Sequence, residues 1–215
     1  MIFKNRKEAG EKLAEKLKDY KNTNAIVYAL PRGGVIVGHE IAQSHNLPLD
    51  LFITRKICHE FNPEYAICAV TENGNNICNE DEKIEINQKW LDGRLREEIK
   101  EAKRRREVYL KNKPMLSPKN KVAIIVDDGI VTGLTIMLAI REIRKENPSK
   151  IIIVVPVIPN AVVDKIMGLV DGVISLKIDK KYVGAVGEYY EDFSQVTDYD
   201  VIGIMSNYNK QNKKE

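Results

Sequence analysis

The segment Val122–Thr135, VAIIVDDGIVTGLT, decides the fold. It opens with VAIIV, an unbroken apolar run of the kind found in strands that are buried on both faces. Two aspartates and a glycine follow at once, and a helical pattern of apolar residues runs from Thr135 to about Glu146. A buried strand that passes through a short polar loop into a helix is the repeating unit of α/β proteins, so this segment predicts a parallel sheet.

Similar apolar runs and helical patterns alternate along the rest of the chain. The predicted strands are AIVYAL (25–30), LDLFIT (49–54), AICAVTE (66–72), IIIVVPVI (151–158) and GVISLKI (172–178). The predicted helices lie near residues 7–20, 34–45, 135–146 and 161–169. We therefore expect residues 1–215 to form a single α/β domain in which a parallel sheet carries helices on both faces.

Two segments interrupt this alternation. Residues 85–110 are strongly charged and carry an apolar stripe at helical spacing, which predicts one long inserted helix. Its basic residues alternate with glutamates at i, i+3 and i+4 spacing. This spacing favours a solvated, salt-bridged helix that covers the sheet or a dimer partner, and a nucleic-acid interface is the alternative. Residues 182–200 are rich in tyrosine and show neither the helical nor the strand period.

The composition argues against several classes of protein. The 215 residues are 43% hydrophobic and carry a net charge of +3, far from the strongly basic balance of a nucleic-acid-binding domain. The longest apolar run is much shorter than the roughly 20 residues of a membrane helix, so we expect no membrane partner. Cys58, Cys68 and Cys78 form no CxxC pair, and we expect them to be reduced thiols in a cytoplasmic protein.

Ligands of open parallel sheets bind beyond the carboxyl ends of the strands, so the residues that directly follow the apolar runs are the candidate site. They are Pro31-Arg32-Gly33-Gly34, Arg55-Lys56, Asp127-Asp128-Gly129 and Thr132-Gly133-Leu134-Thr135. The last of these segments begins a helix, where backbone N–H groups and the helix dipole can cradle a phosphate. The paired aspartates suit a ligand with hydroxyls and a metal ion near its phosphate, such as a sugar phosphate. A capping turn is the alternative, because Asp and Thr are good helix caps.

These motifs also resemble those of a known family. The segment 122–135 resembles the phosphoribosyl-pyrophosphate (PRPP) signature of the type I phosphoribosyltransferases. ALPRGGVIVG (29–38) resembles their pyrophosphate loop, and Arg55-Lys56 resembles their basic pair after the second strand. VGEYYEDFSQV (186–196) is similar to the end of a little-characterised predicted phosphoribosyltransferase branch. The resemblance covers about residues 20–200 and implies a parallel-sheet phosphoribosyltransferase core with a small C-terminal hood at about 180–200.

The resemblance implies a role for each matching residue. The implied PRPP-binding residues are Arg32, Gly33, Gly34, Arg55, Lys56, Asp127, Asp128, Gly129, Thr132, Gly133, Leu134 and Thr135. Asp127 and Asp128 would contact the ribose hydroxyls directly or through Mg²⁺, and these two with Arg32 and Lys56 are the implied catalytic residues. For Arg55 and Lys56, solvated residues at a strand end are the alternative. The resemblance also implies an unusual peptide conformation near Pro31–Gly33.

The implied reaction is Mg²⁺-dependent transfer of the 5-phosphoribosyl group from PRPP to a nitrogen acceptor, with release of pyrophosphate. The enzyme is expected to be a homodimer in the cytoplasm. A non-catalytic PRPP sensor and a hydrolase of PRPP or a related sugar phosphate are the alternatives. A mobile loop should exclude water from the sugar cation. Residues 57–65, which include His59, lie where the resembled family has its flexible loop.

The acceptor itself is not identified by the sequence. Val131 stands where enzymes for hypoxanthine and guanine carry an acidic residue, which argues against those two bases. The hood would supply the acceptor-binding residues Tyr182, Val183, Tyr189 and Tyr190, with Phe193 as a further aromatic candidate. The alternative is that these aromatic rings simply pack against the end of the sheet.

Overall fold

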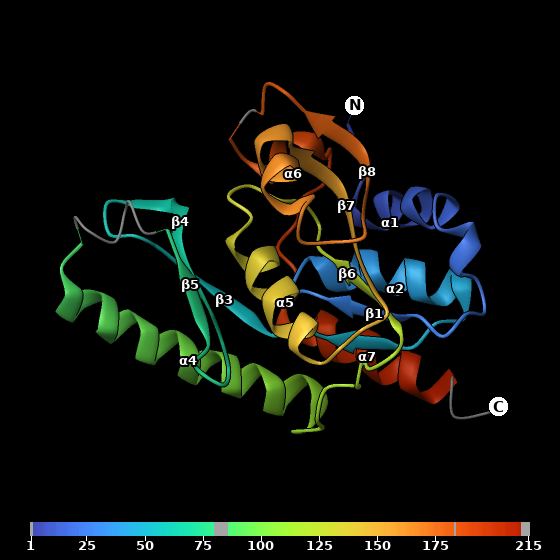
Figure 1. Ribbon diagram of the computed structural model, residues 1–215, viewed down its shortest axis with the longest axis horizontal. Helices are drawn as coiled ribbons and strands as arrows, with labels where there is room; N and C mark the ends of the chain where they lie inside the picture. Colours follow the sequence, from blue (N-terminus) through green and yellow to red (C-terminus); the bar gives the residue numbers. More distant parts are fainter. Residues whose placement is uncertain (1, 80–85, 183, 212–215) are drawn as a thin grey trace.

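The computed structural model describes residues 2–79, 86–182 and 184–211. A five-stranded parallel sheet with the strand order β2-β1-β6-β7-β8 lies at its centre (Figure 1). The strands are β1 Ile26–Ala29, β2 Leu49–Leu51, β6 Val122–Val126, β7 Lys150–Pro159 and β8 Gly172–Asp179. Every neighbouring pair in this sheet is parallel, which confirms the predicted parallel sheet.

Helices cover both faces of the central sheet. The described helices are α1 Arg6–Glu15, α2 Gly34–His45, α5 Leu134–Lys145, α6 Asn160–Ile166 and α7 Asp198–Gln211, together with α4 Gln88–Leu110, which packs on a second sheet. Short 3₁₀ turns lie at Lys18–Tyr20 and Val186–Tyr189. Val27 and Ala29 of β1 belong to the core shared with α1, α2 and α7, whereas Ile26 and Tyr28 belong to the core shared with α5 and α6. Because successive side chains of a strand point to opposite faces, strands that are apolar throughout need cover on both sides.

A second, antiparallel sheet lies beside the first, and the sequence did not predict it. Its strands are β3 Thr54–His59, β4 Asn62–Thr71 and β5 Asn76–Cys78, in that order. The expectation that residues 66–72 join the parallel sheet is wrong, because these residues fall mainly in β4. This strand reads as an apolar run because α4 covers one of its faces and α5 covers the other.

The β3–β4 hairpin also changes three expectations about residues 49–65. The predicted strand 49–54 is divided, since β2 ends at Leu51 and β3 begins at Thr54. Arg55 and Lys56 therefore lie within β3, opposite residues of β4, and do not follow the end of a strand. Residues 57–65, expected as a loop, form the end of this hairpin with a two-residue turn at 60–61.

The long charged helix is present as α4, which lies along the second sheet (Figure 1). It starts later than expected because the Asn87 side chain caps it, accepting a hydrogen bond from the Trp90 backbone N–H at 3.2 Å. Ion pairs within the helix, such as Arg94 with Glu98 and Arg104 with Glu101, confirm its salt-bridged character. Among the described helices, none is both long and apolar enough to cross a membrane.

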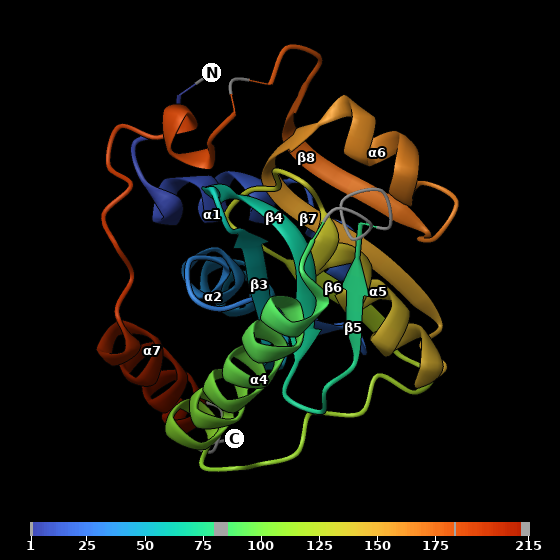
Figure 2. The same cartoon turned by 90° about the vertical axis from the view of Figure 1, so that its left-hand side faces the viewer.

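The C-terminal helix α7 was not predicted. Figure 2 shows it beside α4, and Val201, Met205 and Tyr208 are buried in the core at helical spacing. Its start is a capping box in which the Thr197 and Asp200 side chains each accept a hydrogen bond from the other residue's backbone N–H. The helix is not evident from the sequence because the segment is polar and contains several poor helix formers.

The expectation of three reduced thiols is wrong for two of the cysteines. Cys68 and Cys78 lie directly opposite each other in β4 and β5 and form a disulfide bond. The ten-residue spacing is therefore set by the hairpin, whose register brings the two side chains together. Cys58 takes no part in this bond.

Candidate functional site

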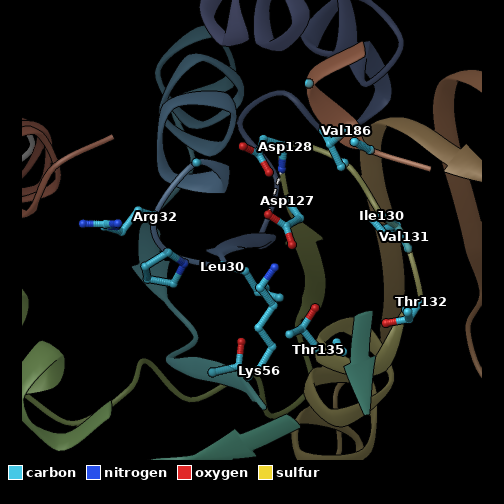
Figure 3. Close-up of a pocket in the computed structure, with 18 of the residues that line it drawn as sticks. Leu30, Arg32, Lys56, Asp127, Asp128, Ile130, Val131, Thr132, Thr135 and Val186 are labelled. Atoms are coloured by element: carbon cyan, nitrogen blue, oxygen red, sulfur yellow. Dashed lines mark hydrogen bonds between the residues drawn. The ribbon is translucent and has the colours of Figure 1, made fainter. Parts of the chain in front are cut away.

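A cavity of about 520 Å³ opens at the carboxyl ends of β1 and β6 (Figure 3). All of the residues predicted to bind PRPP line it except Gly34 and Leu134. Further lining residues come from the β3–β4 hairpin, from α4 and from the segment before and after the 3₁₀ turn at Val186–Tyr189. The loops that are far apart in sequence thus meet at the sheet edge where the fold predicts a ligand.

Two adjacent carboxylates occupy the wall after β6. Asp127 Oδ1 accepts a hydrogen bond from the Asp128 backbone N–H at 2.8 Å, drawn as a dashed line in Figure 3. Burial, and the negative charge of Asp128 next to it, raise the pKa of Asp127 well above its ordinary value. The two aspartates are therefore not equivalent, although they are neighbours in sequence.

Asp128 is held by Arg6, a residue that the sequence reasoning missed. Arg6 Nε lies 2.6 Å from Asp128 Oδ2, and Arg6 Nη1 donates to the Ser194 carbonyl oxygen at 2.9 Å. The Arg6 guanidinium carbon also lies 3.7 Å from the centre of the Phe193 ring. No local sequence signal could have found this ion pair, because its partners are separated by 122 positions.

The loop after β1 contains the unusual peptide that the resemblance implied, since the bond between Pro31 and Arg32 is cis. Its glycines are needed for space. A Cβ atom on Gly33 would lie 1.8 Å from Asp128 Oδ2, and one on Gly34 would lie 2.9 Å from the Asp127 Cα atom. The loop is therefore packed directly against the carboxylate pair.

The Arg32 side chain points away from these carboxylates (Figure 3). Its Nη1 lies 3.7 Å from Asp198 Oδ1 at the start of α7. Asp198 also accepts hydrogen bonds from Tyr109 and Arg104 of α4, at 2.6 and 2.7 Å. In this structure the guanidinium predicted to grip pyrophosphate thus sits at the α4–α7 end of the site.

The loop before α5 has the geometry of a phosphate cradle. Gly133 caps the helix with φ +80, a conformation that favours glycine, and a Cβ there would lie 2.6 Å from Val162. Thr132, Gly133 and Thr135 line the cavity. Leu134 instead packs against the second sheet, so only its backbone could contribute to anion binding at this helix N-terminus.

Three further cations reach the cavity from the second sheet and from α4, which covers it. Arg55 is tied to α4, because its Nε donates to Glu98 Oε2 at 2.7 Å. The exposed Lys56 extends toward Asp127 (Figure 3). Arg105 of α4 lines the cavity and donates to Glu101 Oε1 at 2.9 Å. The charge pattern of the helix predicts only a solvated position for Arg105. Ala102 and Tyr109, which lie near it on the helix, belong to the buried apolar stripe and indicate that this part of α4 faces inward.

The predicted acceptor-binding tyrosines lie outside the cavity wall. Tyr189 and Tyr190 are buried in a cluster with Phe3, and Tyr190 donates to the Asp128 carbonyl oxygen at 2.7 Å. Burial raises the pKa of Tyr190 and of Tyr182. The Tyr182 hydroxyl is buried and finds no hydrogen-bond partner among the described residues, and Val183 lies outside them.

The described part of the hood contributes other residues to the wall. Gly184, Ala185, Val186, Gly187 and Phe193 line the cavity there. Val186 lies directly against the loop after β6, since a Cβ on Gly129 would lie 2.4 Å from its Cγ1 atom. Phe193 is the one aromatic candidate of this segment that the described structure places on the wall. The tyrosines pack the end of the sheet, which is the alternative role that the sequence left open.

The carboxylate pair suits a hard divalent cation that is only partly bound by protein. The described residues contain no group of three or more His, Cys, Asp or Glu side chains that could hold a metal ion. Mg²⁺ commonly retains several water molecules and binds through one or two carboxylates and substrate phosphates. Asp127 and the Oδ1 atom of Asp128 fit that mode of binding.

Known proteins with the same architecture identify the family. A family model described as "Phosphoribosyl transferase domain" matches residues 1–192. Two Mycobacterium tuberculosis proteins named "Putative phosphoribosyl transferase" are each 32% identical to this chain over 95% of its length. The chain spans about half, 46%, of the length of each of these relatives.

A solved structure shows the same fold over nearly the whole chain. The crystal structure of TT1426 from Thermus thermophilus is 32% identical in sequence, with a TM-score of 0.77. The match covers 97% of this chain and 99% of that one. With the family model and the two relatives, it shows that this chain belongs to the phosphoribosyl transferase domain family.

Proposed function

We propose that this cavity binds PRPP and transfers its 5-phosphoribosyl group to a nitrogen acceptor, releasing pyrophosphate. One observation carries the proposal: an anion cradle, a carboxylate pair and a set of cations line the same cavity. A helix N-terminus suits the 5-phosphate, carboxylates suit ribose hydroxyls, and cations suit a diphosphate. PRPP carries these three groups on one small molecule.

In this mechanism the protein chiefly binds PRPP and holds charged side chains in place around it. The bond between ribose C1 and the diphosphate oxygen breaks, and its electron pair leaves with pyrophosphate. The acceptor nitrogen supplies the electron pair of the new bond to C1 from the opposite side of the ring. Positive charge grows on the sugar in the transition state, as in glycoside cleavage, and we assign Asp127 and Asp128 to stabilising that charge.

The leaving group needs cations. Arg55, Lys56 and Arg105 line the cavity, and Arg32 would turn inward from Asp198 to reach a diphosphate. Asp127 and Asp128 would help to hold Mg²⁺ near the substrate, and the positive charge of the ion would offset part of the charge that develops on pyrophosphate. Such fixed charges lower the barrier because they need no rearrangement during the reaction.

The wall formed by Val131, Val186 and Phe193 supports a flat acceptor. Val131 and Phe193 are partly exposed at the cavity, and an apolar, aromatic wall suits a nucleobase-like ring. An apolar Val131 provides no charge for the ring proton of a 6-oxopurine, so we propose an acceptor other than hypoxanthine or guanine.

A panel assay tests this function. The protein is incubated with PRPP, Mg²⁺ and each of a set of nucleobases and small amines, and pyrophosphate release is measured. Acceptor-dependent release supports the transferase. Release without any acceptor supports the hydrolase, and PRPP binding without release across the panel supports the sensor. Asp127→Asn with Asp128→Asn serves as the site control and should abolish PRPP binding in calorimetry.

The homodimer and the cytoplasmic location stay predictions. The Cys68–Cys78 bond argues against a cytoplasmic location, because disulfides are uncommon in a reducing cytosol.

A further inference from the structure

Arg6 is a buried cation of the N-terminal helix that faces the proposed site from behind. It is 8% exposed and does not line the cavity, so it would not touch the substrate. Among the described ion pairs, its contact with Asp128 at 2.6 Å is the one that engages the carboxylate pair. Arg6 can therefore influence the reaction only through the residues that it holds.

The guanidinium of Arg6 is fixed by three different contacts. Nε binds Asp128 Oδ2, Nη1 binds the Ser194 carbonyl oxygen, and the face of the group lies over the Phe193 ring. A planar, delocalised cation can make all three contacts at once, whereas an ammonium group can make only the charge contact well. The geometry thus requires arginine rather than a positive charge alone.

This arrangement also determines how Asp128 is presented. Because Arg6 occupies Oδ2, the remaining oxygen, Oδ1, is the one available to a ligand hydroxyl. The positive charge also offsets the repulsion between Asp128 and its neighbour Asp127. The Asp128 carboxylate also packs directly against the loop after β1, because it fills the space that a Cβ on Gly33 would need.

We propose that Arg6 is a positioning residue for phosphoribosyl transfer, which holds Asp128 in the orientation that receives the ribose hydroxyls of PRPP. This inference rests on the proposed function. It assigns the N-terminal helix α1 to the machinery of the site, and it links the ribose-binding carboxylate to the cavity wall that carries Phe193. Groups that support a binding residue in this way typically matter by about 10–100-fold in affinity or activity.

The test compares PRPP affinity, by calorimetry with Mg²⁺, in wild type and three single variants. Arg6→Met should weaken PRPP binding by about 10–100-fold. Arg6→Lys, which keeps the charge beside Asp128, should recover part of that loss. Lys7→Met is the matched control, because it removes an exposed cation from the next position of the same helix. It should bind PRPP as wild type does.

A double variant separates positioning from a general structural role. If Arg6 acts through Asp128, Arg6→Met added to Asp128→Asn should weaken binding little beyond Asp128→Asn alone. Losses that multiply would overturn the inference. Circular dichroism at the temperature of the titration checks that each variant is folded. If Arg6→Met is unfolded, the PRPP affinity of Arg6→Lys is compared with that of wild type instead.

The positioning role of Arg6 and the proposed function of the cavity are overturned by different results. If folded Arg6→Met binds PRPP as tightly as wild type, the positioning role is wrong and the proposed function stands. If wild type itself does not bind PRPP, the proposed function is wrong, and this inference is wrong with it.

Discussion

Replacing each of the two adjacent aspartates by asparagine should change stability in opposite directions. Asp128 is paired with the buried Arg6, and removing one partner of a buried ion pair costs about 3–5 kcal/mol. Arg6 would keep the Ser194 carbonyl and the Phe193 ring, so we expect the smaller loss of about 2–3 kcal/mol for Asp128→Asn. For a chain of this size, that loss lowers Tm by roughly 4–12 °C.

Asp127→Asn should leave stability unchanged or raise it by up to about 1 kcal/mol. The wild-type side chain is a half-buried carboxyl next to a second negative charge, and this environment raises its pKa. Asparagine removes the charge and can still accept the hydrogen bond from the Asp128 backbone N–H. The expected shift in Tm is between zero and roughly +4 °C.

The pH dependence provides a second check on Asp127. A carboxyl group whose pKa is higher in the folded than in the unfolded chain stabilises the protein fully below its unfolded value, about 3.9. That contribution is lost as the pH rises through the folded pKa. The stability of Asp127→Asn relative to wild type should therefore increase from about pH 4 to pH 7.

Urea unfolding at several pH values, followed by circular dichroism, measures these differences, and calorimetry with PRPP and Mg²⁺ shows whether both variants lose binding. Equal destabilisation of the two variants at about pH 7 would contradict this prediction, because it would mean that the aspartates have the same environment. A greater loss for Asp127→Asn than for Asp128→Asn would refute it as well.

Three further substitutions test other parts of the structure. Gly33→Ala should reduce PRPP affinity at least about tenfold and destabilise the fold by about 1–3 kcal/mol, because its Cβ would lie 1.8 Å from the Asp128 carboxylate; calorimetry and thermal unfolding check both effects. Reduction of the Cys68–Cys78 bond, or Cys68→Ser with Cys78→Ser, should lower stability by about 2–3 kcal/mol given the short loop that it closes, and identical unfolding curves with and without reductant would contradict this. Arg105→Met should raise the KM for PRPP by about 5–50-fold, whereas removal of an exposed cation elsewhere on α4 should leave it unchanged.

The parts of the site that are local in sequence could be predicted. The segment 122–135 contains a strand, a carboxylate pair and a helix start within one short stretch, so periodicity and turn chemistry place its residues without tertiary information. The glycine-rich loop after β1 is local in the same sense. The order of strands in the sheet then brings these loops together, since β1 and β6 are neighbours.

The parts that depend on contacts between distant elements could not be predicted. Arg6 looks like any other basic residue of an amphipathic helix until α1 is placed against Asp128. The strand 66–72 was assigned to the wrong sheet, because a run covered on both faces looks the same in an antiparallel layer as in a parallel one. Cys78 could be identified as the disulfide partner of Cys68 only once the hairpin register was known.

Most of the cations around the site come from outside the sheet that forms its frame. The central sheet provides the two loops, with the aspartates and Arg32, but three further cations arrive on other elements: Arg6 on α1, Arg55 on β3 and Arg105 on α4. Each of these cations is already paired with a carboxylate in this structure. An incoming diphosphate must therefore compete with Glu98 and Glu101 for two of them, and its affinity should rise when either glutamate is replaced by glutamine. The second sheet and α4 thus adjust the affinity for the ligand, while the central sheet determines where the ligand binds.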